Sequence, residues 1–163
     1  MAIRKHRAGE LLVEQTRELA QVRAMLERGG MMTEGIEWPA ACYIVAYMGD
    51  EAVGVIGVEP KIDAALLRSL WVNESMRRRG IGGALVAAAR KAAHTRGARH
   101  LYLFGVDASD FFEHHGFTAV AVAEVIAAIP GVPQVEYYRA QPEELARQVG
   151  YHLDISGDGL IER

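Results

Sequence analysis

The run from Met76 to Leu85, Met-Arg-Arg-Arg-Gly-Ile-Gly-Gly-Ala-Leu, contains the residue types that bind anions. It lies between an apolar stretch, Leu66–Val72, that predicts a strand and an alanine-rich stretch, Ala84–Ala93, that predicts a helix. The first N–H groups of a helix have no partner within the helix, and the helix dipole adds partial positive charge there. Glycines let the backbone approach a ligand, and arginines surround it with charge. We therefore expect a phosphate or pyrophosphate to bind at this turn.

The elements that must position this turn follow from periodicity and turn residues. Apolar residues at helical spacing predict an amphipathic helix over 10–28, which Gly29-Gly30 ends. Further helices are predicted over 84–96, 109–115 and 122–128, with a helical turn opening at Pro142 and a loosely held end at 156–159. Strands are predicted over 42–48, 51–58, 64–72, 100–104, 117–121 and 135–138, the first two joined as a hairpin by Gly49-Asp50. This order predicts an α+β (mixed α/β) domain in which helices flank a mixed sheet.

Composition limits the class of protein. A chain of 163 residues, 50% of them hydrophobic, predicts one globular domain, which we place at residues 1–140 with a partly helical or loosely ordered C-terminal extension at 141–163. The net charge of −3 argues against a nucleic-acid surface, and the single cysteine, Cys42, allows no internal disulfide. Residues Met1–Lys5 lack the apolar region of a secretory signal, and no stretch approaches the ~18 apolar residues of a membrane span. We expect a cytoplasmic protein that contacts no membrane.

Two motifs between Ala65 and Phe117 resemble signatures of the GCN5-related N-acetyltransferase (GNAT) family. Leu70-Trp71-Val72 followed by Arg77-x-x-Gly80-x-Gly82 is similar to the family's coenzyme A pyrophosphate motif, and Ala108-x-x-Phe111-Phe112-Glu113-x-x-Gly116-Phe117 is similar to its second signature. Within the family, Leu66-Leu67-Arg68-Ser69-Leu70 and the Phe-Phe pair look most like acetyltransferases similar to N-acetylglutamate synthase, a group that includes proteins linked to arsenic resistance. The resemblance implies a splayed, mostly antiparallel central sheet of six to seven strands.

The resemblance also implies an acetyl-CoA site. Backbone amides at the start of the alanine-rich helix would surround the pyrophosphate, and a backbone N–H of the preceding strand would meet the thioester carbonyl. The two phenylalanines would form a wall of the pocket. The residues implied in CoA binding are Leu70, Trp71, Val72, Arg77, Arg78, Arg79, Gly80, Ile81, Gly82, Gly83, Ala84, Phe111 and Phe112.

The sequence departs from the family where acid–base residues are usual. Leu66 stands where many relatives carry a glutamate that acts as general base, and Phe112 stands where many carry a tyrosine that protonates the leaving thiolate. The catalytic residues are therefore unknown, and the candidates for this chemistry are Asp63, Glu59 and Tyr102. For each of them an ordinary role, as a surface acid or a half-buried tyrosine, is the favoured alternative. The histidines show no metal-ligand spacing, so we expect no metal site.

The acceptor site is expected at the segment after the first helix and at the last strands, with Arg68, Trp38 and Tyr137 as candidate substrate-binding residues. An Arg68 side chain in the cleft would suit a carboxylate; the alternative is that it reaches solvent or pairs with Asp63. The expected function is transfer of acetyl from acetyl-CoA to a small-molecule amine, such as an amino acid or another acidic amine, by direct attack. A catalytically weak acyl-CoA sensor and a protein N-acetyltransferase are the alternatives. The expected partners are acetyl-CoA and this amine, with no nucleic acid, and a homodimer is left open.

Overall fold

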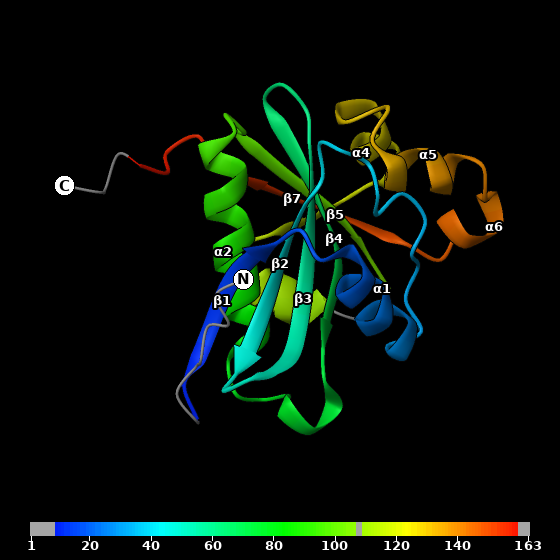
Figure 1. The fold of residues 1–163 in the computed structure, drawn as a ribbon. Helices are drawn as coiled ribbons and strands as arrows, with labels where there is room; N and C mark the ends of the chain where they lie inside the picture. Colours follow the sequence, from blue (N-terminus) through cyan, green and yellow to red (C-terminus); the bar gives the residue numbers. More distant parts are fainter. Residues whose placement is uncertain (1–8, 107–108, 160–163) are drawn as a thin grey trace.

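A computed structural model describes residues 9–106 and 109–159, which fold into a seven-stranded sheet with helices on both faces (Figure 1). Residues Met1–Lys5, Ala108 and the end of the C-terminal extension lie outside the described residues. The strands are β1 (Leu11–Thr16), β2 (Cys42–Met48), β3 (Glu51–Pro60), β4 (Ala64–Val72), β5 (His100–Gly105), β6 (Thr118–Val120) and β7 (Val149–Asp154). The helices are α1 (Leu19–Arg28), a 3₁₀ turn (Glu74–Met76), α2 (Ile81–Thr95), α3 (Ser109–His114), α4 (Val122–Ala128), α5 (Pro133–Arg139) and α6 (Pro142–Leu145).

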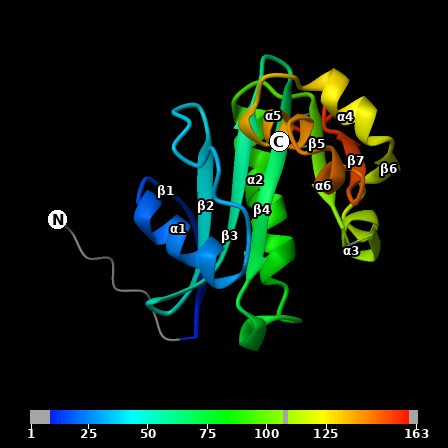
Figure 2. The same ribbon diagram turned by 90° about the vertical axis from the view of Figure 1, so that its right-hand side faces the viewer.

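The strand order is β1-β2-β3-β4-β5-β7-β6, and only the β4–β5 pair is parallel. This confirms the predicted mixed, mostly antiparallel sheet. The parallel pairing joins only Ala64–Leu67 to His100–Leu103. Beyond Leu67, β4 continues without β5, and β5 follows β7 instead, so the two central strands separate toward the end of the sheet where α2 begins (Figure 2). This separation is the splay that the family resemblance implies.

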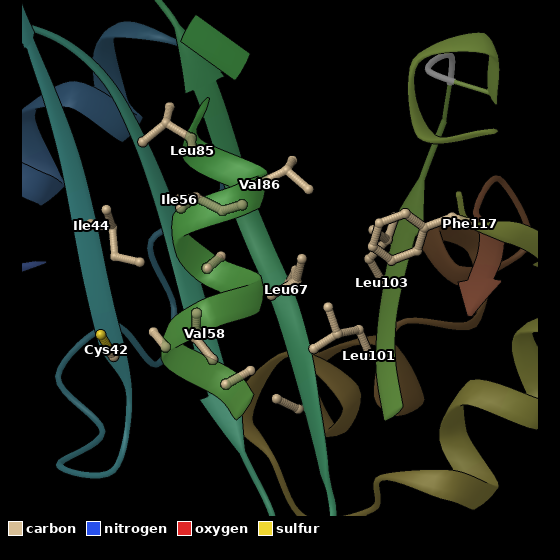
Figure 3. Close-up of a cluster of buried hydrophobic side chains, with 14 of the residues drawn as sticks. Cys42, Ile44, Ile56, Val58, Leu67, Leu85, Val86, Leu101, Leu103 and Phe117 are labelled. Carbon is tan, nitrogen blue, oxygen red and sulfur yellow. The ribbon is translucent and has the colours of Figure 1, made fainter. Parts of the chain in front are cut away.

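Helices bury the sheet on both faces. The side chains of β2–β4 are almost all buried, which is why these segments are nearly continuous apolar runs in the sequence. On one face α2 covers the largest core, and on the other α1 covers β2 and β3 while α4 and α5 cover the start of β4. Figure 3 shows the α2 core, with Leu85 and Val86 of the helix lying over Ile44, Ile56, Leu67 and Leu103 of the strands.

A β-bulge interrupts β4 just where it leaves β5. Val55 faces Trp71 and Gly57 faces Arg68, so β4 contains one more residue than β3 between these pairs. Ser69 accommodates the extra residue with φ +59°, a left-handed conformation that is unusual for a serine in a strand. The bulge breaks the alternation of side chains along β4, so the face on which each later residue lies does not follow from sequence spacing.

Two segments have a different secondary structure from the one predicted. The helix predicted over 10–28 is wrong in its first part, because Leu11–Thr16 hydrogen-bonds to the edge of β2 as an antiparallel strand. The strand predicted over 135–138 is also wrong: this segment lies in α5, which begins at Pro133 and buries Gln134 and Val135 while Glu136 stays exposed. In both cases tertiary packing overrides local propensity.

The chain after Gln141 contributes to the sheet. The predicted helical turn is present as α6, but β7 was not predicted, and it lies between β5 and β6. The expectation of a loosely held end at 156–159 is wrong for Asp158, whose carboxylate accepts two hydrogen bonds of 2.6 Å from Arg90 of α2. The sheet therefore includes residues on both sides of position 140.

Candidate active site

The separation of β4 and β5 opens a cleft of about 1190 Å³. Its walls come from β4 from Leu67 onward, the start of α2, the end of β5, α3, the loop after α1 (residues 29–32), and α5. Such a volume exceeds the range of roughly 300–1,000 Å³ that is common for drug-sized ligands. The cleft is therefore large enough for a long ligand together with a second molecule.

One end of the cleft is the N-terminus of α2. Ala84 is already bonded within the helix, since its N–H donates to the Gly80 carbonyl at 3.0 Å. The N–H groups of Ile81, Gly82 and Gly83 precede it and therefore have no acceptor within the helix. Exposed Arg77 and Arg78 extend over the same end of the cleft. Free amides, the helix dipole and two guanidinium groups together make this end suitable for a diphosphate.

The three glycines of this turn are required for different reasons. Gly80 has φ +79°, which disfavours any residue with a Cβ, although a Cβ there would touch nothing within 4 Å. A Cβ on Gly82 would lie 3.3 Å from the Phe111 ring, and one on Gly83 would lie 3.0 Å from the His115 ring. The last two glycines therefore allow α3 to pack closely against the start of α2, and this contact brings Phe111 into the cleft wall.

Most of the residues implied in CoA binding are brought together at the cleft. Those that line it are Leu70, Trp71, Val72, Arg77, Arg78, Gly80, Ile81, Gly82, Gly83, Phe111 and Phe112. Arg79 and Ala84 are not among the lining residues. Phe112 is 7% exposed and packs against Tyr151 and Phe117, with ring centroids 5.3 and 5.9 Å away. It has no hydroxyl group to donate a proton.

Two of the three candidate acid–base residues lie away from the cleft. Asp63 is exposed in the β3–β4 connection, where its carbonyl accepts hydrogen bonds from the N–H groups of Arg99 (2.7 Å) and His100 (3.2 Å). This is the end of β4 opposite the cleft. Tyr102 is half-buried beside His100 and His152, with its ring centroid 4.9 Å from that of His152, and burial raises its pKa. Neither residue lines the cleft.

The third candidate, Glu59, forms a fully buried ion pair with Arg68. The Arg68 Nη1 atom lies 2.9 Å from Glu59 Oε2, and both side chains are 0% exposed. Arg68 thus neither reaches solvent nor pairs with Asp63, the two alternatives considered from the sequence. Burial raises the pKa of Glu59, while the guanidinium of Arg68 and the N–H of Gln134 oppose this shift. Glu59 is not among the residues that line the cleft, whereas Arg68 is.

The ion pair connects the walls of the cleft. Arg68 donates to the carbonyls of Glu34 (2.8 Å) and Met32 (3.3 Å) in the loop after α1, and its Nε donates to Ser69 Oγ in the bulge (2.9 Å). The remaining oxygen of Glu59, Oε1, accepts the N–H of Gln134 in α5 at 2.9 Å. The loop, the bulge and α5 are therefore fixed to one another by two oppositely charged side chains.

The predicted acceptor residues Trp38 and Tyr137 do not line the cleft. Trp38 lies in a separate cavity of about 590 Å³ that shares no lining residue with the cleft. The Tyr137 hydroxyl donates to the Glu144 carboxylate at 2.9 Å, and this hydrogen bond raises its pKa to about 12. The next residue, Tyr138, does line the cleft; its ring packs edge-on against Phe104, and burial raises its pKa.

Gln134 also lines the cleft and was not a sequence candidate. It is four residues before Tyr138, so the two share one face of α5. The sequence contains one signal for this relation, because Pro133 favours the first position of a helix. In a helix that begins there, Gln134 and Tyr138 share one face. The strand predicted over 135–138 concealed this relation.

Comparison with known protein families agrees with the splayed sheet and the cleft described above. Residues 39–119 match the family model described as the acetyltransferase (GNAT) domain. The chain belongs to the GNAT family of acetyltransferases. None of the curated proteins matches the sequence.

Solved structures with a similar fold include an N-acetylglutamate synthase from Neisseria gonorrhoeae complexed with coenzyme A and N-acetyl-glutamate, with a TM-score of 0.70 and 15% identity over 91% of this chain. This chain spans only 36% of that protein. Rv2747 from Mycobacterium tuberculosis, in complex with CoA, has a TM-score of 0.67 and 18% identity, covering 88% of this chain and 98% of its own. A GNAT acetyltransferase from Staphylococcus aureus has a TM-score of 0.65 and 13% identity, covering 90% and 99%. At these identities the likeness concerns the fold.

Within residues 9–106 and 109–159, no helix combines the length and apolar character needed to cross a membrane. The same described residues contain no group of three or more His, Cys, Asp and Glu side chains placed to hold a metal ion.

Proposed function

We propose that this protein transfers acetyl from acetyl-CoA to the nitrogen of a small-molecule amine, by direct attack and without a covalent acetyl-enzyme. The observation that carries the proposal is the continuity of the cleft. It runs from the free amides of α2, past the edge of β4 that β5 leaves uncovered, to Tyr138 and Gln134 of α5. A donor and an acceptor bound at its two ends would meet at the bulge of β4.

The donor end would hold CoA through this chain's own groups. Amides of Ile81, Gly82 and Gly83 would donate to the diphosphate, and Arg77 and Arg78 would add positive charge around it. The backbone of β4 beyond Leu67 is not paired with β5, so it is available to hydrogen-bond an extended ligand and the thioester carbonyl.

The acceptor must be a neutral amine when it attacks. No Asp or Glu lines the described part of the cleft, so an ammonium group would lose water without gaining a carboxylate partner. Desolvation therefore favours the neutral amine, which compensates for the leucine at position 66. The amine nitrogen bonds to the carbonyl carbon, the C–S bond breaks, and the proton released by nitrogen ends on the CoA thiolate or in water.

A second function, an acyl-CoA sensor without turnover, is supported by the same lack of a lining carboxylate and by Phe112. The acidic acceptor considered from the sequence loses its main support, because Glu59 neutralises the Arg68 charge that would bind it.

An amine panel with acetyl-CoA distinguishes the two functions. We expect thiol release that depends on an amine, followed with a thiol reagent, and an acetylated amine by mass spectrometry. Thermal stabilisation by acetyl-CoA without thiol release from any amine would contradict the transferase and favour the sensor.

A further inference from the structure

We infer that the side-chain amide of Gln134 binds the acceptor amine, and that this acceptor is a primary amine with an uncharged, apolar body. The inference rests on the proposed function and names the acceptor class for that same cleft.

The backbone of Gln134 is held firmly, although its side chain is not. Its N–H donates to Glu59 Oε1 at 2.9 Å, so the buried ion pair fixes this position of α5. The preceding Pro133 packs tightly against Gly35, where an added Cβ would clash with the proline Cβ. The start of α5 is therefore fixed from two sides, and the Gln134 side chain extends from a fixed point into the cleft wall.

The side chain of Gln134 lacks a hydrogen-bond partner where it needs one. The residue is 8% exposed, and among the described residues its buried Oε1 accepts no hydrogen bond. Buried polar atoms are almost always bonded, so a missing partner calls for an explanation. Because Gln134 lines the cleft, a ligand there is the group that can supply the donor. It does so after a half-turn of the terminal amide, which exchanges the buried Oε1 with Nε2 and turns the oxygen toward the cleft. An amine N–H is such a donor, and a neutral amide oxygen, unlike a carboxylate, adds no negative charge that would hold the amine as ammonium.

The charges around Gln134 indicate the body of the acceptor. The Arg68 guanidinium is neutralised by Glu59 and donates to Glu34, Met32 and Ser69, so it has no net charge to offer a carboxylate. The other arginines of the cleft, Arg77 and Arg78, precede the α2 helix at the donor end. Apart from Gln134, the side chains that α5, β5 and the loop after α1 bring to the cleft are apolar or aromatic: Met31, Met32, Leu103, Phe104 and Tyr138.

The experiment compares 2-phenylethylamine with L-phenylalanine, which has the same body with an added carboxylate, in wild type, Gln134→Met and Gln141→Met. Methionine keeps the length of glutamine without the amide, and Gln141 is an exposed glutamine on the same segment that does not line the cleft. We expect wild type to prefer 2-phenylethylamine. In Gln134→Met the KM for this amine should rise by about 3–10-fold, the equivalent of one neutral hydrogen bond. The affinity for acetyl-CoA and the melting temperature should stay unchanged, and Gln141→Met should behave as wild type.

Each result has one reading. An unchanged amine KM in Gln134→Met overturns the role of Gln134, and a preference for L-phenylalanine overturns the acceptor class; both leave acetyl transfer standing. Absence of amine-dependent thiol release from wild type with any amine overturns the proposed function and this inference with it. If Gln134→Met does not fold, Gln134→Leu, which also lacks the amide, is measured in the same way.

Discussion

Removing one member of the Glu59–Arg68 ion pair should strongly destabilise the fold. In Arg68→Met the Glu59 carboxylate stays buried without its cation, and breaking such a pair costs about 3–5 kcal/mol of unfolding free energy. Both side chains are 0% exposed, so solvent screening does not reduce this figure. The double variant Glu59→Met with Arg68→Met leaves no buried charge. Its main losses are hydrogen bonds, to the N–H of Gln134 and to the carbonyls of Met32 and Glu34, so we expect it to be more stable than either single variant.

Urea denaturation of the four proteins measures this coupling, and pH gives a second test. Burial holds the folded-state pKa of Glu59 above its ordinary value of 4.5, and removing Arg68 takes away a group that opposes this shift. A carboxyl group with a raised folded pKa takes up protons on folding, so the stability of Arg68→Met should fall as pH rises above about 4.5. The loss relative to wild type should therefore be larger at pH 8 than at pH 5.

The control is the exposed pair Arg23–Glu37, whose atoms lie 3.7 Å apart and whose side chains are 46% and 70% exposed. Arg23→Met should cost less than about 1 kcal/mol. A loss below about 1 kcal/mol in Arg68→Met, or a double variant that loses the sum of the two single losses, would refute the reasoning, since either result means that the two charges do not depend on each other.

Three further variants test the anion site, the turn at Gly80 and the Arg90–Asp158 ion pair. Arg78→Ala should weaken acetyl-CoA binding by roughly 3–10-fold in calorimetry, and less so at high salt, whereas Arg79→Ala, outside the cleft, should not. Gly80→Ala should cost about 1–2 kcal/mol by denaturation, from the positive φ alone, because nothing crowds its Cβ. The pair of Arg90 with Asp158 lowers the carboxyl pKa, so its contribution, about 1 kcal/mol at most for a partly exposed pair, should be present at neutral pH and lost as pH falls below the ordinary value of 3.8. Equal unfolding pH profiles for wild type and Arg90→Ala would contradict this.

The anion site could be predicted from the sequence because its parts are local. A strand, a turn containing Gly80 and a helix start follow one another within about 20 residues, and their geometry depends little on distant packing. The strands over 42–48 and 64–72 and the helix over 122–128 were likewise confirmed at both ends. In these segments the apolar pattern and the turn residues agree.

The acceptor half of the cleft could not be predicted in this way, because distant contacts build it. The bulge at Ser69 changes the faces on which Leu70 and Trp71 lie relative to Arg68, and the β3–β4 pairing brings Glu59 to Arg68 as its partner. A helix takes the place of the strand predicted over 135–138, which brings Gln134 into the cleft wall and removes Tyr137 from it.

The sequence by itself therefore determined the location of the proposed diphosphate site, since unpaired amides at a helix start are a consequence of local backbone geometry. Only the tertiary structure decided which side chains line the half of the cleft that we propose for the acceptor. That surface depends on which buried charges neutralise each other, and this balance is set by chain segments far apart in the sequence.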